Sequence, residues 1–251
     1  MSNIVFELCA EGIDACLAAR AGGAHRIELC SALSEGGITP SHGLIRAAVQ
    51  QSGLPVHVLL RPRGGDFVYS DGDLELMRED LEHARSLGVS GVVLGLLRLG
   101  RTVDVERTRM FVEQAGALQV TFNRAFDTTV SKEQALEDVI DSGCTRLLTS
   151  GGERDVLKGA ESLSRLVKQA QGRIEIAVGG GLRLHNAATV ARTTAAQHFH
   201  GSLQRPVLDP TQGDGSVIFE DGEPSPQKRF VVDSNDVRQM IQNLNGEGAG
   251  K

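Results

Sequence analysis

The feature that most constrains the fold of this chain is a regular alternation between short aliphatic runs and longer segments with helical spacing. Eight short runs, most of them rich in Val, Ile and Leu, are typical of buried strands. They cover residues 4–8, 26–29, 56–60, 91–94, 118–122, 146–149, 174–178 and 197–200. Between these runs, apolar residues recur at i, i+3 and i+4, as in Leu74, Met77 and Leu81, which indicates amphipathic helices.

Strict alternation of strand and helix predicts parallel strands joined by right-handed crossovers. Eight units in 251 residues average about 31 residues each, which suits a closed barrel. A doubly wound open sheet is the structural alternative. That fold usually has a Gly-rich fingerprint after its first strand, and Cys9-Ala10-Glu11-Gly12 is not one. We therefore predict an α/β fold, a single (β/α)8 TIM barrel over residues 1–203.

The pattern breaks after the eighth run, so residues 204–251 are expected to form a C-terminal extension. Residues 201–229 are rich in Pro and Gly and have little apolar periodicity. They predict a long loop over the barrel mouth or against a partner subunit. A last helix is expected from Ser234 to about Leu244, capped by Ser234, with a disordered tail after it.

Composition excludes several classes of function. Lys and Arg total 26 against 32 Asp and Glu, a net charge of −6, which argues against a nucleic-acid partner. No apolar run approaches the ~20 residues of a membrane span, and the N-terminus lacks the features of a secretory signal. Four cysteines are too few for a disulfide scaffold. These observations together predict a cytoplasmic protein with reduced thiols.

Two of the cysteines follow the same short motif at the ends of the first two strands. Phe6-Glu7-Leu8-Cys9 and Ile27-Glu28-Leu29-Cys30 share the pattern apolar, Glu, Leu, Cys. Side chains alternate along a strand, so each Glu shares a face with its Cys. Adjacent strands are ~4.8 Å apart, so the two sulfurs could approach each other, and paired thiolates favour Cu(I). The alternative is that both thiols are small core residues, as is expected of Cys16 and Cys144.

Two loops after strands carry charged residues that could act on a ligand. Arg61 and Arg63 flank a proline after the third strand and offer forked donors for a carboxylate or phosphate. They could instead pair with an inward-facing Glu. After the fifth strand, Asn123, Arg124 and Asp127 form a polar cluster, in which the arginine and the aspartate could equally be a simple loop ion pair.

Glycine-rich turns follow the last two strands. Gly179, Gly180 and Gly181 follow the seventh strand, and Gly201 and Ser202 follow the eighth. Backbone N–H groups at these turns often bind phosphate in a (β/α)8 barrel, although such turns also occur only because they are tight.

The histidines fall into two groups. The last strand brings His198 and His200 onto one face, where they could ligate metal, shuttle protons or be hydrogen-bonded core residues, and His57 is similar. The remaining four are expected at the surface or at helix ends: His25, His42, His83 and His185.

Several long motifs resemble the copper homeostasis protein CutC family. They are Arg61-Pro62-Arg63-Gly64-Gly65-Asp66-Phe67-Val68-Tyr69-Ser70-Asp71, Arg26-Ile27-Glu28-Leu29-Cys30, Glu35-Gly36-Gly37-Ile38-Thr39-Pro40-Ser41, Val120-Thr121-Phe122-Asn123-Arg124-Ala125-Phe126-Asp127 and Leu147-Leu148-Thr149-Ser150-Gly151. The resemblance implies a (β/α)8 barrel, an intracellular homo-oligomer and Cu(I) bound by Cys9 and Cys30. Asn123 departs from the family pattern, which usually has His there, and an amide does not titrate near neutral pH.

Three hypotheses of function follow. The first is a cytosolic copper homeostasis protein with Cu(I) on Cys9 and Cys30. The second is an enzyme acting on a small phosphorylated or carboxylated metabolite, with Glu7 or Glu28 as acid or base and the arginines and glycine turns holding the anion. The third is an interaction scaffold whose barrel mouth has no remaining activity. The sequence identifies no reaction.

Overall fold

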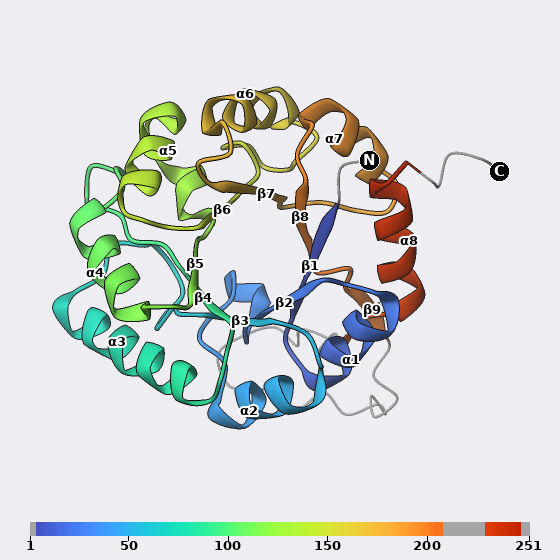
Figure 1. Ribbon diagram of the computed structural model, residues 1–251, viewed down its shortest axis with the longest axis horizontal. Helices are drawn as coiled ribbons and strands as arrows, with labels where there is room; N and C mark the ends of the chain where they lie inside the picture. Colours follow the sequence, from blue (N-terminus) through green and yellow to red (C-terminus); the bar gives the residue numbers. More distant parts are fainter. Residues whose placement is uncertain (1–3, 208–228, 247–251) are drawn as a thin grey trace, which may run out of the picture.

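The computed structural model describes residues 4–207 and 229–246, and these form a closed barrel of eight parallel strands ringed by helices (Figure 1). Each strand pairs with its sequence neighbour, and β1 pairs with β8 to close the ring. The strands are β1 Val5–Ala10, β2 Arg26–Leu29, β3 Val56–Leu59, β4 Gly91–Leu94, β5 Gln119–Phe122, β6 Arg146–Thr149, β7 Glu175–Gly179 and β8 His198–Gly201. The predicted (β/α)8 fold is confirmed, with every expected strand present.

The helices lie on the outside of the barrel. They are α1 Ile13–Gly22, α2 His42–Gln51, α3 Asp71–Ser86, α4 Val105–Ala115, α5 Lys132–Asp141, α6 Ala160–Ala170, α7 Ala187–Thr194 and α8 Ser234–Leu244. Two short 3-10 helices, η1 Leu33–Glu35 and η2 Arg124–Thr128, and a small antiparallel ribbon of β9 Arg205–Val207 with β10 Arg229–Val231 complete the described chain. No helix in the described ranges is long and apolar enough to cross a bilayer.

Alternation along the strands separates an apolar outer face from a polar inner face. Phe6, Leu8 and Ile27 are buried in the main hydrophobic core between the strands and the helices. Because alternate residues face the other way, Glu7 and Glu28 project into the barrel. The interior is therefore lined with charged side chains, and the closing register sets Glu7 opposite His200.

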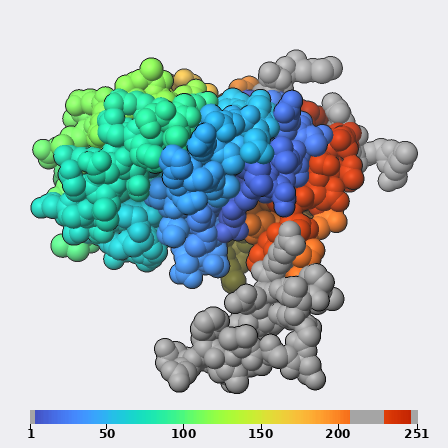
Figure 2. Space-filling model, turned by 90° about the horizontal axis from the view of Figure 1, so that it is seen from below, coloured from blue at the N-terminus to red at the C-terminus, as the bar shows by residue number. Residues whose placement is uncertain are grey.

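The C-terminal helix α8 packs against α1 and α7, and Figure 2 shows it in red beside the blue N-terminal segment. A Cβ on Gly22 would lie 2.4 Å from Cβ of Val237, so only glycine permits this close approach. The N-cap of α8 is Asp233, whose carboxylate accepts from the N–H of Asn235, and the prediction of Ser234 as the cap was wrong. Most of the expected long loop, residues 208–228, and the tail from 247 onward lie outside the described residues.

Candidate functional site: a thiol pair inside the barrel

The two cysteines of the repeated motif meet inside the barrel. Cys9 lies in β1 opposite Glu28 of β2, and Cys30 directly follows β2 on the same face. Their Sγ atoms are 3.7 Å apart and are not joined in a disulfide. Cys30 therefore lies two residues beyond the β2 partner of Cys9, on the same face, and the parallel pairing of β1 with β2 brings the two sulfurs together.

One side of the thiol pair is apolar. Cys9 and Cys30 form a small cluster with Leu59 and Val93, separate from the main core, and Leu33 packs against it. Cys9 is 2% exposed and Cys30 is 0% exposed. The sulfurs are therefore shielded from bulk water on this side.

The other side of the thiol pair is polar. Sγ of Cys9 lies 3.9 Å from Oε1 of Glu28, and Cys9, Glu28 and His200 place ligand atoms within 4.8 Å of one another. The second carboxylate oxygen of Glu28 is buried and has no hydrogen-bond partner in the described part of the chain. The site thus combines two sulfurs, a carboxylate and an imidazole.

Burial and neighbouring charge set the protonation of this group. The hydrogen bond with Cys30, together with burial, raises the pKa of the Cys9 thiol well above its ordinary range. Burial raises the pKa of Glu28 as well. Burial alone would lower the pKa of His200, but the carboxylates of Glu28 and Glu7 outweigh it and raise that pKa, which favours an imidazolium.

Glu7 is the centre of an ion-pair network beneath the thiols. Its carboxylate accepts from Arg146 at 2.7 Å, contacts Arg26 at 3.1 Å and lies 2.8 Å from Nδ1 of His200. Burial would raise the pKa of Glu7, yet the surrounding positive charges overcome it and hold that pKa far below its ordinary value. Glu7 is therefore a fixed negative charge that orients His200.

Arg26 and Arg146, the two arginines of this network, are not among the site residues predicted from the sequence. Both occupy the first position of a strand, and Arg26 shares the inward parity of Glu28. The alternation of side chains along β2 could therefore have predicted that Arg26 faces into the barrel. His57 also faces inward but is neutral, because burial lowers its pKa to about 3. Burial likewise lowers the pKa of His198, which lies at the edge of the network.

Arg61 holds the loop that covers Cys30. Its guanidinium donates to the carbonyl oxygens of Glu35 and Gly37, at 2.8 and 2.7 Å, and to that of Gly65. A Cβ on Gly37 would lie 2.8 Å from Leu59 and 3.6 Å from Sγ of Cys30. We call residues 31–38 the covering loop. Nη1 and Nη2 of Arg61 donate to these carbonyl oxygens, whereas Nε is buried and has no hydrogen-bond partner among the described residues. Within the described ranges, Arg61 forms no ion pair with Glu7 or Glu28.

Arg63 is held within the loop that follows β3. Its guanidinium pairs with Asp66 at 3.1 Å and with Asp73 at 3.3 Å, and it donates to the carbonyl of Val68. These local contacts fix the turn that leads into α3.

Asp127 acts as an internal anion at the end of β6. Its carboxylate accepts from Nε of Arg124 at 2.8 Å, from the hydroxyl of Thr149 and from the N–H groups of Ser150 and Gly152. Arg124 also donates to the hydroxyl of Ser150. The backbone donors after β6 are thus occupied by a side chain of the protein.

The glycine turns after β7 and β8 are tight. Gly180 and Gly181 have φ values of +105° and +73°, a region that favours glycine. A Cβ on Gly180 would lie 2.9 Å from Cζ of Arg124, and one on Gly179 would lie 2.9 Å from Cβ of His200. Gly201 ends β8, and Ser202 follows it. These glycines let the guanidinium and the imidazole approach the backbone closely.

Asn123 caps the 3-10 helix η2. Its Oδ1 accepts from the N–H of Ala125 at 2.9 Å, and its side chain is buried beside Gly95. The amide serves a structural purpose here and cannot titrate.

Fold and site together define a class: a (β/α)8 barrel that buries two neighbouring thiols at the carboxyl ends of its first two strands. The model of the CutC family matches residues 4–205. The chain belongs to the CutC family.

Three relatives illustrate the similarity. The family protein CutC of Chromobacterium violaceum is 47% identical over 200 residues, covering 80% of this chain and 81% of its own. That of Bacteroides fragilis is 41% identical over 247 residues, covering 97% and 98%. A crystal structure from Streptococcus agalactiae, provisionally identified as the copper homeostasis protein CutC, is 33% identical with a TM-score of 0.75 and covers 79% and 98%.

Proposed function

We propose that this chain is a cytoplasmic copper homeostasis protein that binds Cu(I) through Cys9 and Cys30. The observation that carries the proposal is the 3.7 Å separation of the two sulfurs. Metal–sulfur bonds of about 2.3 Å allow one ion to contact both atoms at such a separation. Soft thiolates select Cu(I) over hard ions such as Mg²⁺ or Ca²⁺.

The polar side of the site supports the same proposal. Two thiolates on one Cu(I) leave a net negative charge, which is costly to bury without a partner. The imidazolium of His200 lies within reach of that charge, and the carboxylate of Glu28 stands beside Cys9, where it can accept the thiol proton. The carboxylate of Glu28 also offers a further ligand atom.

Access to the thiols requires movement, since both are buried. The covering loop packs against Cys30, and Arg61 holds it closed through the carbonyl oxygens of Glu35 and Gly37. The loop contains Ala32 in the left-handed region at φ +50°, a conformation that costs energy for a residue with a side chain. We expect the metal to enter when this loop opens.

A Cu(I) titration under reducing conditions tests the proposal. We expect the unmodified chain to bind one Cu(I) tightly in competition with a chromogenic chelator, and the Cys9→Ser/Cys30→Ser variant to lose that binding. The matched control is Cys16→Ser/Cys144→Ser, which removes the two other buried thiols and should leave the affinity unchanged. Equal Cu(I) affinity in both double variants would overturn the proposal.

The small anionic metabolite is less well supported by the geometry. Arg61 donates to three carbonyl oxygens, and Arg124 is held by Asp127 and Ser150, which leaves fewer donors for an anion. We therefore favour Cu(I) binding over an enzymatic reaction on a small anionic metabolite. The homo-oligomer expected from the family resemblance stays a prediction, which sedimentation equilibrium would check.

A further inference from the structure

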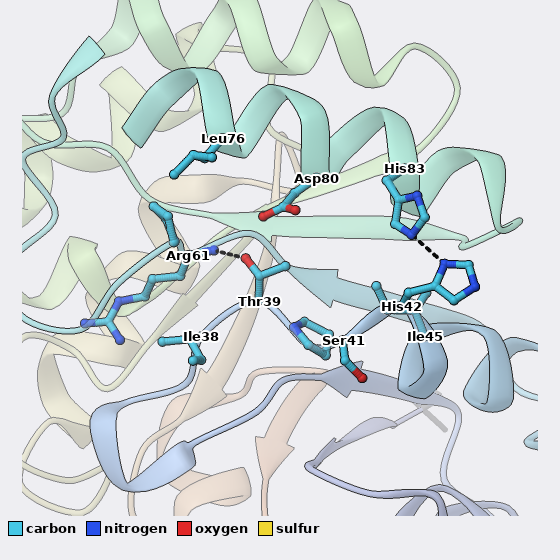
Figure 3. A pocket seen from close by; sticks show the side chains of 11 residues that line it. Ile38, Thr39, Ser41, His42, Ile45, Arg61, Leu76, Asp80 and His83 are labelled. Carbon is cyan, nitrogen blue, oxygen red and sulfur yellow. Dashed lines mark hydrogen bonds between the residues drawn. The ribbon is translucent and has the colours of Figure 1, made fainter. Parts of the chain in front are cut away.

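A cavity of about 440 Å³ opens on the outer wall of the barrel, between α2 and α3 (Figure 3). The loops after β2 and β3 form one end of it. Its lining includes Thr39, His42, Ile45, Leu76, Asp80 and His83. Ile38 of the covering loop and Arg61 line the end formed by the loops, so the cavity borders the segment that covers Cys30, but neither histidine contacts the thiols.

Two histidines from different helices meet at one end of this cavity. His42 is the first residue of α2, and His83 lies in the last turn of α3. Nδ1 of His42 and Nε2 of His83 are 2.8 Å apart, with the ring centroids 4.9 Å apart (Figure 3). Both side chains are exposed, so both rings can turn without disturbing the core.

The two nitrogens share a hydrogen bond in this structure, and their separation also suits neighbouring ligands on one metal ion. With metal–nitrogen bonds of about 2.0–2.1 Å, ligands at a right angle have nitrogens about 2.9 Å apart, whereas tetrahedral ligands have them about 3.3 Å apart. Right-angled coordination is typical of Ni²⁺ and Cu²⁺, while Zn²⁺ prefers a tetrahedron. Imidazole is a preferred ligand of all three ions.

We propose that His42 and His83 form a second metal site, on the outer wall of the barrel, which takes a divalent ion of tetragonal or octahedral preference such as Ni²⁺ or Cu²⁺. Each ring turns slightly, and the ring that donates in the hydrogen bond moves its proton to its other nitrogen, so that both lone pairs converge on the ion. The remaining coordination positions face the cavity and are filled by water or a small ligand anion.

Asp80 adds negative charge near this site. It lies one helical turn before His83 on α3, and Figure 3 shows its carboxylate directed toward Thr39 and the cavity. Half-burial raises the pKa of Asp80, but at neutral pH its carboxylate favours a cation nearby. We assign it a supporting electrostatic role.

The site does not depend on the copper proposal, and the experiment can separate the two. We would titrate Ni²⁺ by calorimetry into the full-length Cys9→Ser/Cys30→Ser variant. The two substitutions remove the thiol site, which would otherwise compete for the metal. One equivalent of Ni²⁺ should bind. Adding His42→Gln or His83→Gln should weaken binding at least tenfold, and His185→Gln, a change at an exposed histidine outside the cavity, should alter it less than twofold.

A second metal gives an independent readout. Zn²⁺ should bind this site more weakly than Ni²⁺, because the nitrogen spacing suits ligands at a right angle better than a tetrahedron. Absence of Ni²⁺ binding, or binding that survives both His42→Gln and His83→Gln, would overturn the inference. Unchanged circular dichroism would confirm that these surface variants remain folded.

Discussion

Glu7 and Arg146 are 139 positions apart in the sequence, yet their side chains form a 2.7 Å ion pair inside the barrel. Each side chain is only 1% exposed. Such a pair contributes little net stability when compared with apolar packing, because burial of both charges is costly. Loss of one partner is far more damaging, since it leaves the other charge buried without compensation.

The substitution Glu7→Gln should destabilise the fold by about 3–5 kcal/mol at pH 7. The pKa of Glu7 in the folded chain lies below its ordinary value of 4.5, so its stabilising contribution is complete above pH 4.5. That contribution should diminish as the pH falls below 4.5, and the two proteins should converge. Urea unfolding at several pH values measures the difference. Glu161→Gln, which breaks an exposed pair with Arg165, should have little effect at any pH.

His57 should make the fold sensitive to acid. Burial lowers its pKa from 6.5 to about 3, so between these pH values the unfolded chain binds a proton at His57 and the folded chain does not. This group therefore lowers stability progressively as the pH falls from 6.5 toward 3, by about 3 kcal/mol at pH 4. The variant His57→Leu should lose that part of the pH dependence in urea titrations. A slope between pH 6.5 and 4 equal to that of the unmodified chain would contradict this account.

The covering loop should limit the reactivity of the thiols. Arg61→Met removes the donors for the carbonyls of Glu35 and Gly37, so the loop should open more often. We expect Cys30 to react at least tenfold faster with an aromatic disulfide reagent at pH 8, under conditions where the protein stays folded. Arg63→Met is the matched control, because its contacts fix a different turn. Equal rates in the two variants would show that another element restricts access.

Gly37 should be intolerant of a side chain. Its φ is +85°, and an added Cβ would approach Leu59 to 2.8 Å. Backbone strain and overpacking together should cost about 2–4 kcal/mol in Gly37→Ala. Gly43→Ala in α2 meets nothing within 4 Å and replaces a helical glycine, so it should stabilise by roughly 0.5 kcal/mol. Thermal unfolding of the two variants compares them directly.

The sequence predicted the barrel well because each unit repeats a local pattern. Strand positions follow from aliphatic runs, and the parity within them correctly paired Glu7 with Cys9 and Glu28 with Cys30. The approach of the two thiols also followed from neighbouring strands. Such features depend on short-range periodicity and on one topological rule, so a single sequence was enough.

Contacts between distant units were harder to predict. Nothing in the local sequence indicates that Arg61 donates to the carbonyls of its neighbouring loop, or that Arg146 crosses the barrel to Glu7. The pairing of His42 with His83 also depends on how α2 and α3 pack side by side. These relationships arise from tertiary packing, which alternation and spacing do not specify.

The pairing of β1 with β8 has a consequence for the time at which the thiol site can form. Glu7 makes its contact with His200, which lies 193 positions later in the sequence, and α8 covers α1 later still. A ribosome adds roughly 5–20 residues per second. The cysteines therefore leave the exit tunnel many seconds before the imidazole that completes their surroundings. A nascent chain presents two unshielded sulfurs, and the finished pocket exists only after translation has delivered its last strand.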